Sequence, residues 1–317
     1  MRAVPPRQVA RRARAAVRPR SLAKGALALA AAALLGGMPS AAAAPPRARP
    51  RRPGPFAELA GPAVVSVEVP SAALHRLVPT LVYLPPGYPR ARARYPTLVL
   101  LHGVPGSGHQ LFAKLDLANV LTALVRARRM PPTIVVAPSD GPSSGTDTEW
   151  EDSPVKPSSR WGTFVADDLA RYLQGNLPVC TSRAAHAIGG LSMGAFGAVN
   201  LALRHPDEYG AATLWSGYFV ANTPAIDGPR NSPEWRDDSP LYYLPTIARR
   251  VRESGLRLSF YTGRKDEFYA ENVAFARLLG AERIPYRFQV LPGRHSWRLW
   301  RAELVPQLTW VGAVEHC

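Results

Sequence analysis

The residues with the clearest chemical potential form the segment Gly190-Leu-Ser192-Met-Gly194. A G-x-S-x-G string alone is weak, because it arises by chance in roughly one chain in ten of this composition. Here it follows the apolar run 185–190 and precedes the helical stretch 193–204. A strand, a sharp turn and a helix would present the Ser192 hydroxyl at a helix N-terminus, where negative charge is favoured. We therefore predict that Ser192 is a nucleophile rather than a solvated serine in a tight turn.

A serine nucleophile needs a base, which follows it in the chain in this arrangement. Three histidines remain downstream: His205, His295 and His316. His205 ends the helix that starts at the serine and is interpreted as a helix cap, and His316 is the penultimate residue. His295 lies in a GRHSW loop after the apolar run 285–292, at the edge of the sheet where the serine is expected. We predict that His295 is the base.

The orienting acid is expected to end an earlier strand at the same edge. Asp266 follows the apolar run 256–263 within the sequence RKDEF, and Glu267 is the alternative if the loop is shifted by one residue. An aspartate in a surface turn is the plainer interpretation. In the catalytic interpretation Asp266 holds the histidine tautomer and stabilises the imidazolium that forms when His295 takes the serine proton.

Acyl transfer also requires donors for the oxyanion of the tetrahedral intermediate. The N–H of Met193, directly after the serine, is one candidate. The second is expected in the turn after the apolar run 97–102, which contains His102-Gly-Val104-Pro105. Proline has no N–H, so Val104 is the predicted donor. His102 is expected to pack or to form hydrogen bonds beneath this loop rather than to act as a base.

The elements that must position these residues are predicted from apolar periodicity. Two alternating stretches, 64–69 and 77–85, indicate antiparallel strands, and short buried runs with helices between them indicate parallel strands. The six later strands are expected at 97–102, 133–138, 185–190, 210–216, 256–263 and 285–292. The helices are expected at 110–129, 161–174, 193–204, 242–253, 268–279 and 297–311. The pattern predicts an α/β three-layer sandwich with a mostly parallel eight-stranded sheet.

Two polar segments, 139–160 and 217–240, fit no regular element. Each follows a predicted parallel strand and is expected at the carboxyl edge of the sheet, where α/β proteins bind ligands. They are predicted to wall the substrate pocket. Its candidate lining residues, for which an ordinary core or surface role is equally compatible, are Trp150, Trp161, Trp215 and Tyr218. The histidines show no spacing typical of zinc hydrolases, and we expect no metal and no cofactor.

The net charge of +16 suggests nucleic-acid binding until its distribution is considered. Residues 1–55 carry twelve basic residues and no acid, which leaves 27 basic against 23 acidic residues in the rest of the chain. Those basic residues are scattered and form no stripe interleaved with aromatic residues. The sequence argues against a nucleic-acid partner.

The N-terminal segment has the order of a bacterial export signal: a basic head, a short apolar run and small residues. We predict a signal peptide at 1–43, a Pro/Arg-rich linker at 44–62 and one catalytic domain at 63–317. The apolar run is short for a membrane span, although an uncleaved anchor is the alternative. The expected location is secreted or associated with the cell envelope, with no stable membrane insertion after cleavage.

The chain contains two cysteines, Cys180 and Cys317. In the predicted topology Cys180 precedes a central strand and Cys317 follows a helix that runs back from the catalytic edge. Both are expected at the opposite edge, so a disulfide is predicted for an oxidising compartment. Two free thiols are the alternative.

Six segments together resemble the Putative esterase family of α/β-hydrolases, which includes esterase D, feruloyl esterases, enterochelin-esterase-like proteins and mycolyltransferases. The segments, in chain order, are LVYLPPGY, LLHG, GLSMGAFGA, HPDEYGA, the late Asp266 and GRHSW, and the resemblance runs from about Val64 to Trp310. It implies the α/β-hydrolase fold and hydrolysis of carboxylic esters without a cofactor. The triad implied is Ser192, Asp266 and His295, with oxyanion donors Val104 and Met193.

The resemblance leaves the substrate open between small-molecule and cell-wall esters. Two other functions stay open as well. An acyltransferase of the mycolyltransferase type would share every catalytic residue. A non-catalytic cell-envelope binding protein on the same scaffold is the other alternative, although the intact order of serine, acid and histidine argues against it.

Overall fold

A computed structural model describes residues 55–56, 58–141 and 147–317. The predicted signal peptide and most of the predicted linker lie outside the described residues. The linker was predicted to end at residue 62, and β1 does begin at Ala63. However, Phe56 is only 1% exposed and belongs to the core, so the packed part of the chain starts before the predicted boundary. Burial of a phenylalanine ring is favourable by about 2 kcal/mol, so Phe56 holds this end of the segment against the core.

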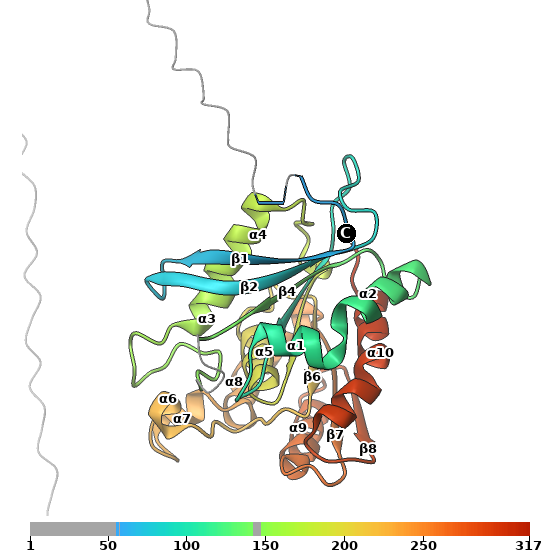
Figure 1. Ribbon diagram of the computed structural model, residues 1–317. Coiled ribbons are helices and arrows are strands. Elements are labelled where there is room, and N and C mark those ends of the chain that lie inside the picture. The colour runs from blue at the N-terminus through green and yellow to red at the C-terminus, as the bar shows by residue number, and fades with distance from the viewer. Residues whose placement is uncertain (1–54, 57, 142–146) are drawn as a thin grey trace, which may run out of the picture. The chain divides into compact units, whose positions relative to one another are not determined.

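One eight-stranded sheet organises the described chain, in the order β1-β2-β4-β3-β5-β6-β7-β8 (Figure 1). The strands are β1 (Ala63–Ser71), β2 (Arg76–Leu84), β3 (Thr97–Leu101), β4 (Ile134–Pro138), β5 (His186–Leu191), β6 (Ala211–Trp215), β7 (Arg257–Gly263) and β8 (Tyr286–Leu291). The pairs β1–β2 and β2–β4 are antiparallel, and all other pairs are parallel. The prediction of a mostly parallel eight-stranded sheet is confirmed.

Helices cover both faces of this sheet and give the predicted three layers. They are α1 (Gly108–Leu115), α2 (Leu117–Arg126), α3 (Trp161–Thr163), the π-helix η1 (Phe164–Leu169), α4 (Ala170–Asn176), the 3₁₀-helix η2 (Arg183–Ala185), α5 (Met193–Arg204), α6 (Pro224–Asp227), α7 (Pro233–Asp237), α8 (Pro240–Ser254), α9 (Tyr269–Ala281) and α10 (Trp297–Val314). One apolar core packs α1, α2 and α10 on one face of the sheet, and a second core packs η1, α5, α8 and α9 on the other. None of the described helices is both long and apolar enough to cross a bilayer.

The regular elements differ from the prediction in three places. The helix predicted at 161–174 contains a π-helix, η1, between α3 and α4. The helix predicted at 110–129 is divided, because Asp116 adopts a left-handed conformation with φ of 51° between α1 and α2. The polar segment 217–240 contains two short helices, α6 and α7, each with a proline in its first turn. These helices are too short to show an apolar periodicity in the sequence. The only local signal is the proline in the first turn of each, a position where proline favours the start of a helix.

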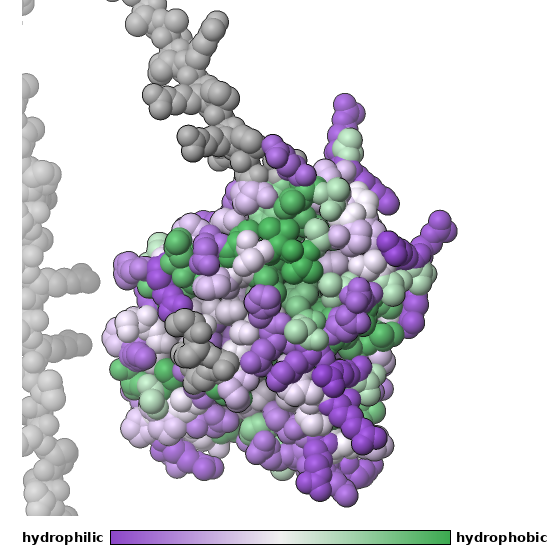
Figure 2. Space-filling view, viewed as in Figure 1, coloured by the Kyte–Doolittle hydropathy of each residue, from purple (hydrophilic) through white to green (hydrophobic). Residues whose placement is uncertain are grey.

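The outer surface is mainly polar. Figure 2 shows hydrophilic side chains distributed over the viewed face around a hydrophobic patch in its upper half. Exposed apolar side chains include Val64 and Leu77 of the edge hairpin β1–β2. Individual exposed apolar residues of this kind are normal on a protein surface.

Candidate active site

Four loops at the carboxyl edge of the parallel strands carry the predicted chemistry. Ser192 follows β5, Asp266 follows β7 and His295 follows β8, while the segment 102–106 follows β3. The carboxyl ends of parallel strands share one edge of a sheet, so this topology gathers residues that are far apart in the chain.

Ser192 stands in a constrained turn between β5 and α5. Its backbone has φ of 57° and ψ of −123°, a combination that non-glycine residues rarely adopt. The Ser192 N–H donates to the Trp215 carbonyl at 3.0 Å, which fixes the turn to the neighbouring strand. A Cβ on Gly194 would lie 2.0 Å from the Leu101 carbonyl oxygen, so only glycine permits this approach of α5 to β3. The turn holds the hydroxyl at the N-terminus of a helix, where a developing negative charge is favoured.

The His295 ring lies between the serine and the aspartate. Its Nε2 is 2.9 Å from Ser192 Oγ, and its Nδ1 is 3.2 Å from each carboxylate oxygen of Asp266. The ring also meets Phe268 and Trp300 edge to face, with centroids 5.3 and 5.0 Å away. The structure therefore brings the three predicted residues together in the order serine, histidine, aspartate.

The loops that carry Asp266 and His295 are tied to each other. The Lys265 N–H donates to the Gly293 carbonyl at 2.9 Å, and Asp266 Oδ1 accepts from the Phe268 N–H at 3.0 Å. The Asp266 side chain has no exposed surface, whereas 19% of the His295 side chain is exposed. A buried, fixed carboxylate beside a partly open imidazole can orient the ring and stabilise its protonated form.

The predicted oxyanion donors lie next to the serine. Met193 is the first residue of α5, so its N–H has no acceptor within the helix. A side chain on Gly103 would come within 3.0 Å of Ser192 Cβ, which places the 103–104 segment against the nucleophile. Val104 lines the cleft that contains Ser192 and His295.

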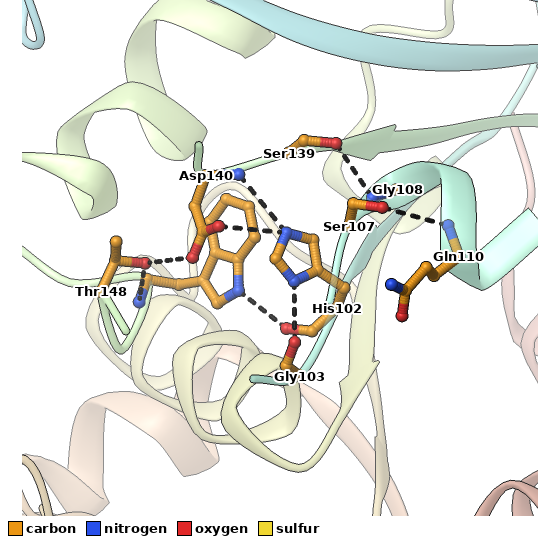
Figure 3. A network of polar contacts seen from close by, with 9 residues as sticks. His102, Gly103, Ser107, Gly108, Gln110, Ser139, Asp140 and Thr148 are labelled. Atoms are coloured by element: carbon orange, nitrogen blue, oxygen red, sulfur yellow. Dashed lines mark hydrogen bonds and ion pairs between the residues drawn. The ribbon is translucent and has the colours of Figure 1, made fainter. Parts of the chain in front are cut away.

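His102 lies directly beneath this segment, and its ring is held on both sides (Figure 3). Nδ1 is 2.9 Å from the Gly103 carbonyl oxygen, and Nε2 accepts from the Asp140 N–H at 3.3 Å. An Nε2 that accepts leaves the proton on Nδ1, which then donates to Gly103. The Trp150 Nε1–H in turn donates to the His102 carbonyl at 3.0 Å. These contacts position the backbone that carries the Val104 N–H.

Burial changes the titration of this second histidine and its carboxylate. Loss of hydration lowers the pKa of His102 to about 4 and raises the pKa of Asp140 to about 7. The His102 Nε2 is 3.4 Å from Asp140 Oδ1, and both side chains are at most 2% exposed. His102 is therefore neutral at pH 7. The sequence indicated a supporting role for His102 but gave no sign of Asp140, which lies 38 residues away.

The cleft above Ser192 is about 300 Å³ in volume. It is lined by the 102–107 loop, by Gln110 and Lys114 of α1, and by Trp297 and Trp300 of α10. Lys114 Nζ lies 4.9 Å from the Trp297 ring centroid, so a cation stacks on an aromatic ring at the rim. Trp297 and Trp300 were missed as lining residues, although their position two and five residues after His295 places them in the first turns of the following helix.

The aromatic residues predicted to line this cleft lie elsewhere. None of Trp150, Trp161, Trp215 and Tyr218 is among its lining residues, and each is at most 4% exposed. Trp150 packs between His102 and Trp161, and Tyr218 stacks on Phe196. The prediction for these four residues is corrected: large apolar rings lose the most hydrated surface when they pack in the core.

The segments 139–160 and 217–240, predicted as pocket walls, contribute no lining residue to this cleft either, as far as their described residues go. They pack against each other instead. Ser153 Oγ donates to the Ile226 carbonyl at 2.5 Å, and Thr223 Oγ1 donates to Glu149 at 2.7 Å.

The two cysteines meet at the opposite edge of the sheet from the active-site loops. Cys180 and Cys317 are joined in the structure with Cα atoms 5.6 Å apart, a separation typical of a disulfide. Cys180 precedes β5 and Cys317 follows α10, as the predicted topology required.

The family model described as Putative esterase matches residues 71–311. Esterase Rv1288 of Mycobacterium tuberculosis is 31% identical over 141 residues, which are 43% of this chain and 28% of that protein. The diacylglycerol acyltransferase/mycolyltransferase Ag85B of Mycobacterium avium is 25% identical over 185 residues, 46% of this chain and 53% of that protein. The matched segments thus span about half or less of these relatives.

Among solved structures, a ferulic acid esterase superposes with a TM-score of 0.71 at 24% identity. The superposition covers 80% of this chain and 98% of that one. A similarity at this level of identity shows that the two proteins share a fold.

Proposed function

Because the chain belongs to the Putative esterase family, we propose that it is a serine esterase that cleaves carboxylic esters through an acyl-enzyme intermediate. The observation that carries this proposal is the line of contacts from Ser192 Oγ through His295 to Asp266, with 2.9 Å between the hydroxyl and Nε2. A nucleophile within hydrogen-bond reach of a base, which is itself oriented by an acid, is the arrangement that activates a serine.

In the proposed reaction, Ser192 Oγ attacks the ester carbonyl while His295 Nε2 takes the hydroxyl proton. The N–H groups of Met193 and Val104 stabilise the oxyanion of the tetrahedral intermediate. Collapse breaks the bond to the alcohol oxygen, which receives the proton from His295, and leaves an ester on Ser192. Water then attacks this ester with His295 again as base, which releases the acid and restores the serine.

The cleft supports a small ester with an apolar or aromatic group as substrate. At about 300 Å³ it has the size of a small-molecule site, and Trp297 and Trp300 offer flat apolar surfaces beside His295. The second substrate class in this proposal is cell-wall esters, of which only the reacting end would enter the cleft.

The test is hydrolysis of a series of p-nitrophenyl esters with short to long acyl chains, by the purified protein and by Ser192→Ala. We expect turnover by the parent and loss of at least about 10³-fold in kcat by the variant. Equal rates would overturn the proposal and would favour a non-catalytic binding protein on this scaffold. Intact mass spectrometry after a fluorophosphonate probe gives an independent readout, because only the parent should gain a covalent adduct.

Acyl transfer is the second candidate, and similarity to a protein named as an acyltransferase favours it. The same acyl-enzyme would be attacked by a sugar or glycerol hydroxyl instead of water. Product analysis with trehalose or glycerol present separates the two functions, because a transferase gives a new ester and a hydrolase gives the free acid.

Export is the last part of the proposal, and the order of residues in segment 1–43 supports it. Expression of the full chain in a bacterial host, followed by mass spectrometry of the extracytoplasmic protein, should find a mature form that begins near residue 44. An uncleaved protein in the membrane fraction would instead support an anchor.

A further inference from the structure

Two buried carboxylates and one partly buried carboxylate meet beside Trp150. We name Glu151, Asp227 and Asp238 the acidic trio. One ligand oxygen from each lies within 4.8 Å of the others. Glu151 is 6% exposed and Asp227 has no exposed surface. The trio joins the two polar segments 147–153 and 219–239, which the proposed reaction does not use.

Each carboxylate of the trio is anchored through one oxygen only. Asn200 donates to Glu151 Oε1, the Thr223 N–H donates to Asp227 Oδ2 at 2.7 Å, and Arg204 lies 3.5 Å from Asp238 Oδ1. The remaining oxygens, Glu151 Oε2, Asp227 Oδ1 and Asp238 Oδ2, are buried and have no hydrogen-bond partner in the part of the chain that the structure describes. Buried polar atoms are rarely left in this way, so three together call for a ligand.

The charges point to a cation as that ligand. The trio carries three negative charges when ionised, and Arg204 offers one positive charge beside it. Asp147 and Glu149 lie close by and share the Thr223 hydroxyl at 2.8 and 2.7 Å. Burying several like charges without compensation is very costly. One divalent cation would neutralise the excess charge of the trio and Arg204 together.

The geometry and chemistry of the oxygens favour a hard, rather large ion. Calcium binds oxygen ligands at about 2.3 to 2.6 Å, so two oxygens on opposite sides of the ion are about 4.6 to 5.2 Å apart. Two oxygens that bind the same calcium ion can be no farther apart than this, and the trio's oxygens, all within 4.8 Å of one another, meet that limit. The trio contains no histidine or cysteine, which zinc and copper prefer, and magnesium usually retains several waters rather than accept three carboxylates.

Two members of the trio, Glu151 and Asp238, also have a route to solvent. A cavity of about 290 Å³ is lined by Glu151, Asp238, Asn200 and Arg204, together with exposed residues such as Asp152 and Asp167. Water that enters this cavity can complete the coordination of an ion.

We propose that Glu151, Asp227 and Asp238 bind one calcium ion, which joins the segments 147–153 and 219–239 behind the active-site loops. The role of the ion is structural. Trp150, the neighbour of Glu151 in the chain, donates to the His102 carbonyl beneath the 103–104 segment, so an ion on Glu151 helps to hold that segment in place. This inference does not depend on the proposed esterase function.

The test measures binding and thermal unfolding with the full chain, first treated with EGTA and then dialysed. Calcium chloride is compared with magnesium chloride at constant ionic strength. We expect about one calcium per chain by equilibrium dialysis, and a rise in Tm of about 5 to 10 °C at a calcium concentration 100 times Kd. Terbium luminescence excited through tryptophan provides a second readout, because Trp150 adjoins the trio.

The matched variants are Glu151→Gln and Asp227→Asn, with Asp207→Asn as control. Asp207 is an exposed aspartate that binds Arg250 at 2.7 Å, so its loss removes a carboxylate without touching the trio. The trio variants should lose stoichiometric calcium and the Tm response, and the control should keep both. Ser192→Ala should bind calcium like the parent, which separates this test from that of the esterase.

Two results would overturn the calcium site. One is a parent protein that binds no calcium at millimolar concentration and whose Tm does not respond to it. The other is a pair of trio variants that are more stable than the parent whether or not calcium is present, because the carboxylates then share protons instead of an ion. The parent measurements decide the matter even if a variant fails to fold.

Discussion

Two histidine–carboxylate pairs border the cleft that contains Ser192, and they differ in what surrounds them. The nearest N–O distances are similar, 3.2 Å for His295–Asp266 and 3.4 Å for His102–Asp140. The His295 side chain is 19% exposed and its Nε2 meets Ser192, whereas His102 is 2% exposed and both its ring nitrogens meet backbone groups.

This comparison teaches that a histidine beside a carboxylate is not by itself a base. A base must reach both a substrate proton and its own acid, and must tolerate a positive charge. Burial lowers the pKa of His102 to about 4, so its positive form is disfavoured. In the proposed function the two pairs divide the work: His295 moves protons, and His102 holds a loop.

The sharpest test of this division of roles replaces each histidine in turn. His295→Ala should reduce kcat by about 10⁴- to 10⁶-fold, because the proton on Ser192 then has no acceptor. His102→Asn should leave a much larger activity. The measurement is kcat for a short p-nitrophenyl ester, with circular dichroism to verify folding. If His102→Asn were as inactive as His295→Ala while folded, the assignment of roles would be wrong.

The two carboxylates provide the next largest contrast. Asp266→Asn should lower kcat by about 10³- to 10⁴-fold, because the asparagine no longer stabilises protonated His295 or its tautomer. Asp140→Asn keeps the backbone N–H that binds His102 and should lower kcat by less than about tenfold. Steady-state kinetics of the two variants, measured side by side, give the ratio. Similar losses for both would contradict the comparison.

A moderate effect is expected when the support beneath the oxyanion segment is removed. His102→Asn loses the bond from Nδ1 to the Gly103 carbonyl, so the Val104 N–H is less well placed. We expect kcat to fall by about 10- to 100-fold, less than the loss of one oxyanion donor, while KM changes little. His109→Asn is the matched control, since His109 is exposed on α1 near the same loop. A rise in KM with unchanged kcat would instead indicate a role in substrate binding.

The smallest effect is on the pH dependence of stability. In Asp140→Asn, His102 keeps a folded pKa of about 4, below its ordinary value of 6.5. The unfolded chain then binds the extra proton between these values, so the free energy of unfolding should fall as the pH is lowered from 6.5 to 4. The slope should reach at most about 1.4 kcal/mol per pH unit.

The reciprocal variant, His102→Gln, leaves Asp140 with a folded pKa of about 7, above its ordinary value of 3.8. Here the folded chain holds the extra proton, so the free energy of unfolding should fall as the pH rises from 3.8 to 7. In the parent the opposing slopes nearly cancel between pH 4 and 6.5. Urea unfolding at several pH values measures all three slopes, and slopes of the same sign in the two variants would refute the shifted pKa values.

Much of the candidate site was predictable because its signals are local. Ser192 lies between a strand and a helix, and the φ of 57° that it adopts is imposed by the turn between them. Asp266 and His295 each follow an apolar run by a few residues. Topology then brings them together, since parallel strands end at one edge.

Other features were not predictable, for reasons that are also physical. Nothing near Asp140 in the sequence indicates that it meets His102, because their contact depends on how β3 and β4 lie side by side. Trp150 and Tyr218 were placed in the pocket because both follow strands, but packing of the two polar segments buries them. The acidic trio was overlooked for the same reason, as acids in polar loops are ordinarily solvated.

By itself, the sequence determined the order of strands and helices, the position of the nucleophile, and which histidine and aspartate follow the right strands. Those depend on apolar periodicity and turn residues, which are properties of neighbouring positions. Only the tertiary structure decided which side chains lose water, and therefore the pKa of His102, the lining of the cleft and the meeting of Glu151, Asp227 and Asp238. Desolvation and charge interactions depend on distances between residues remote in the chain, and only the packed fold sets those distances.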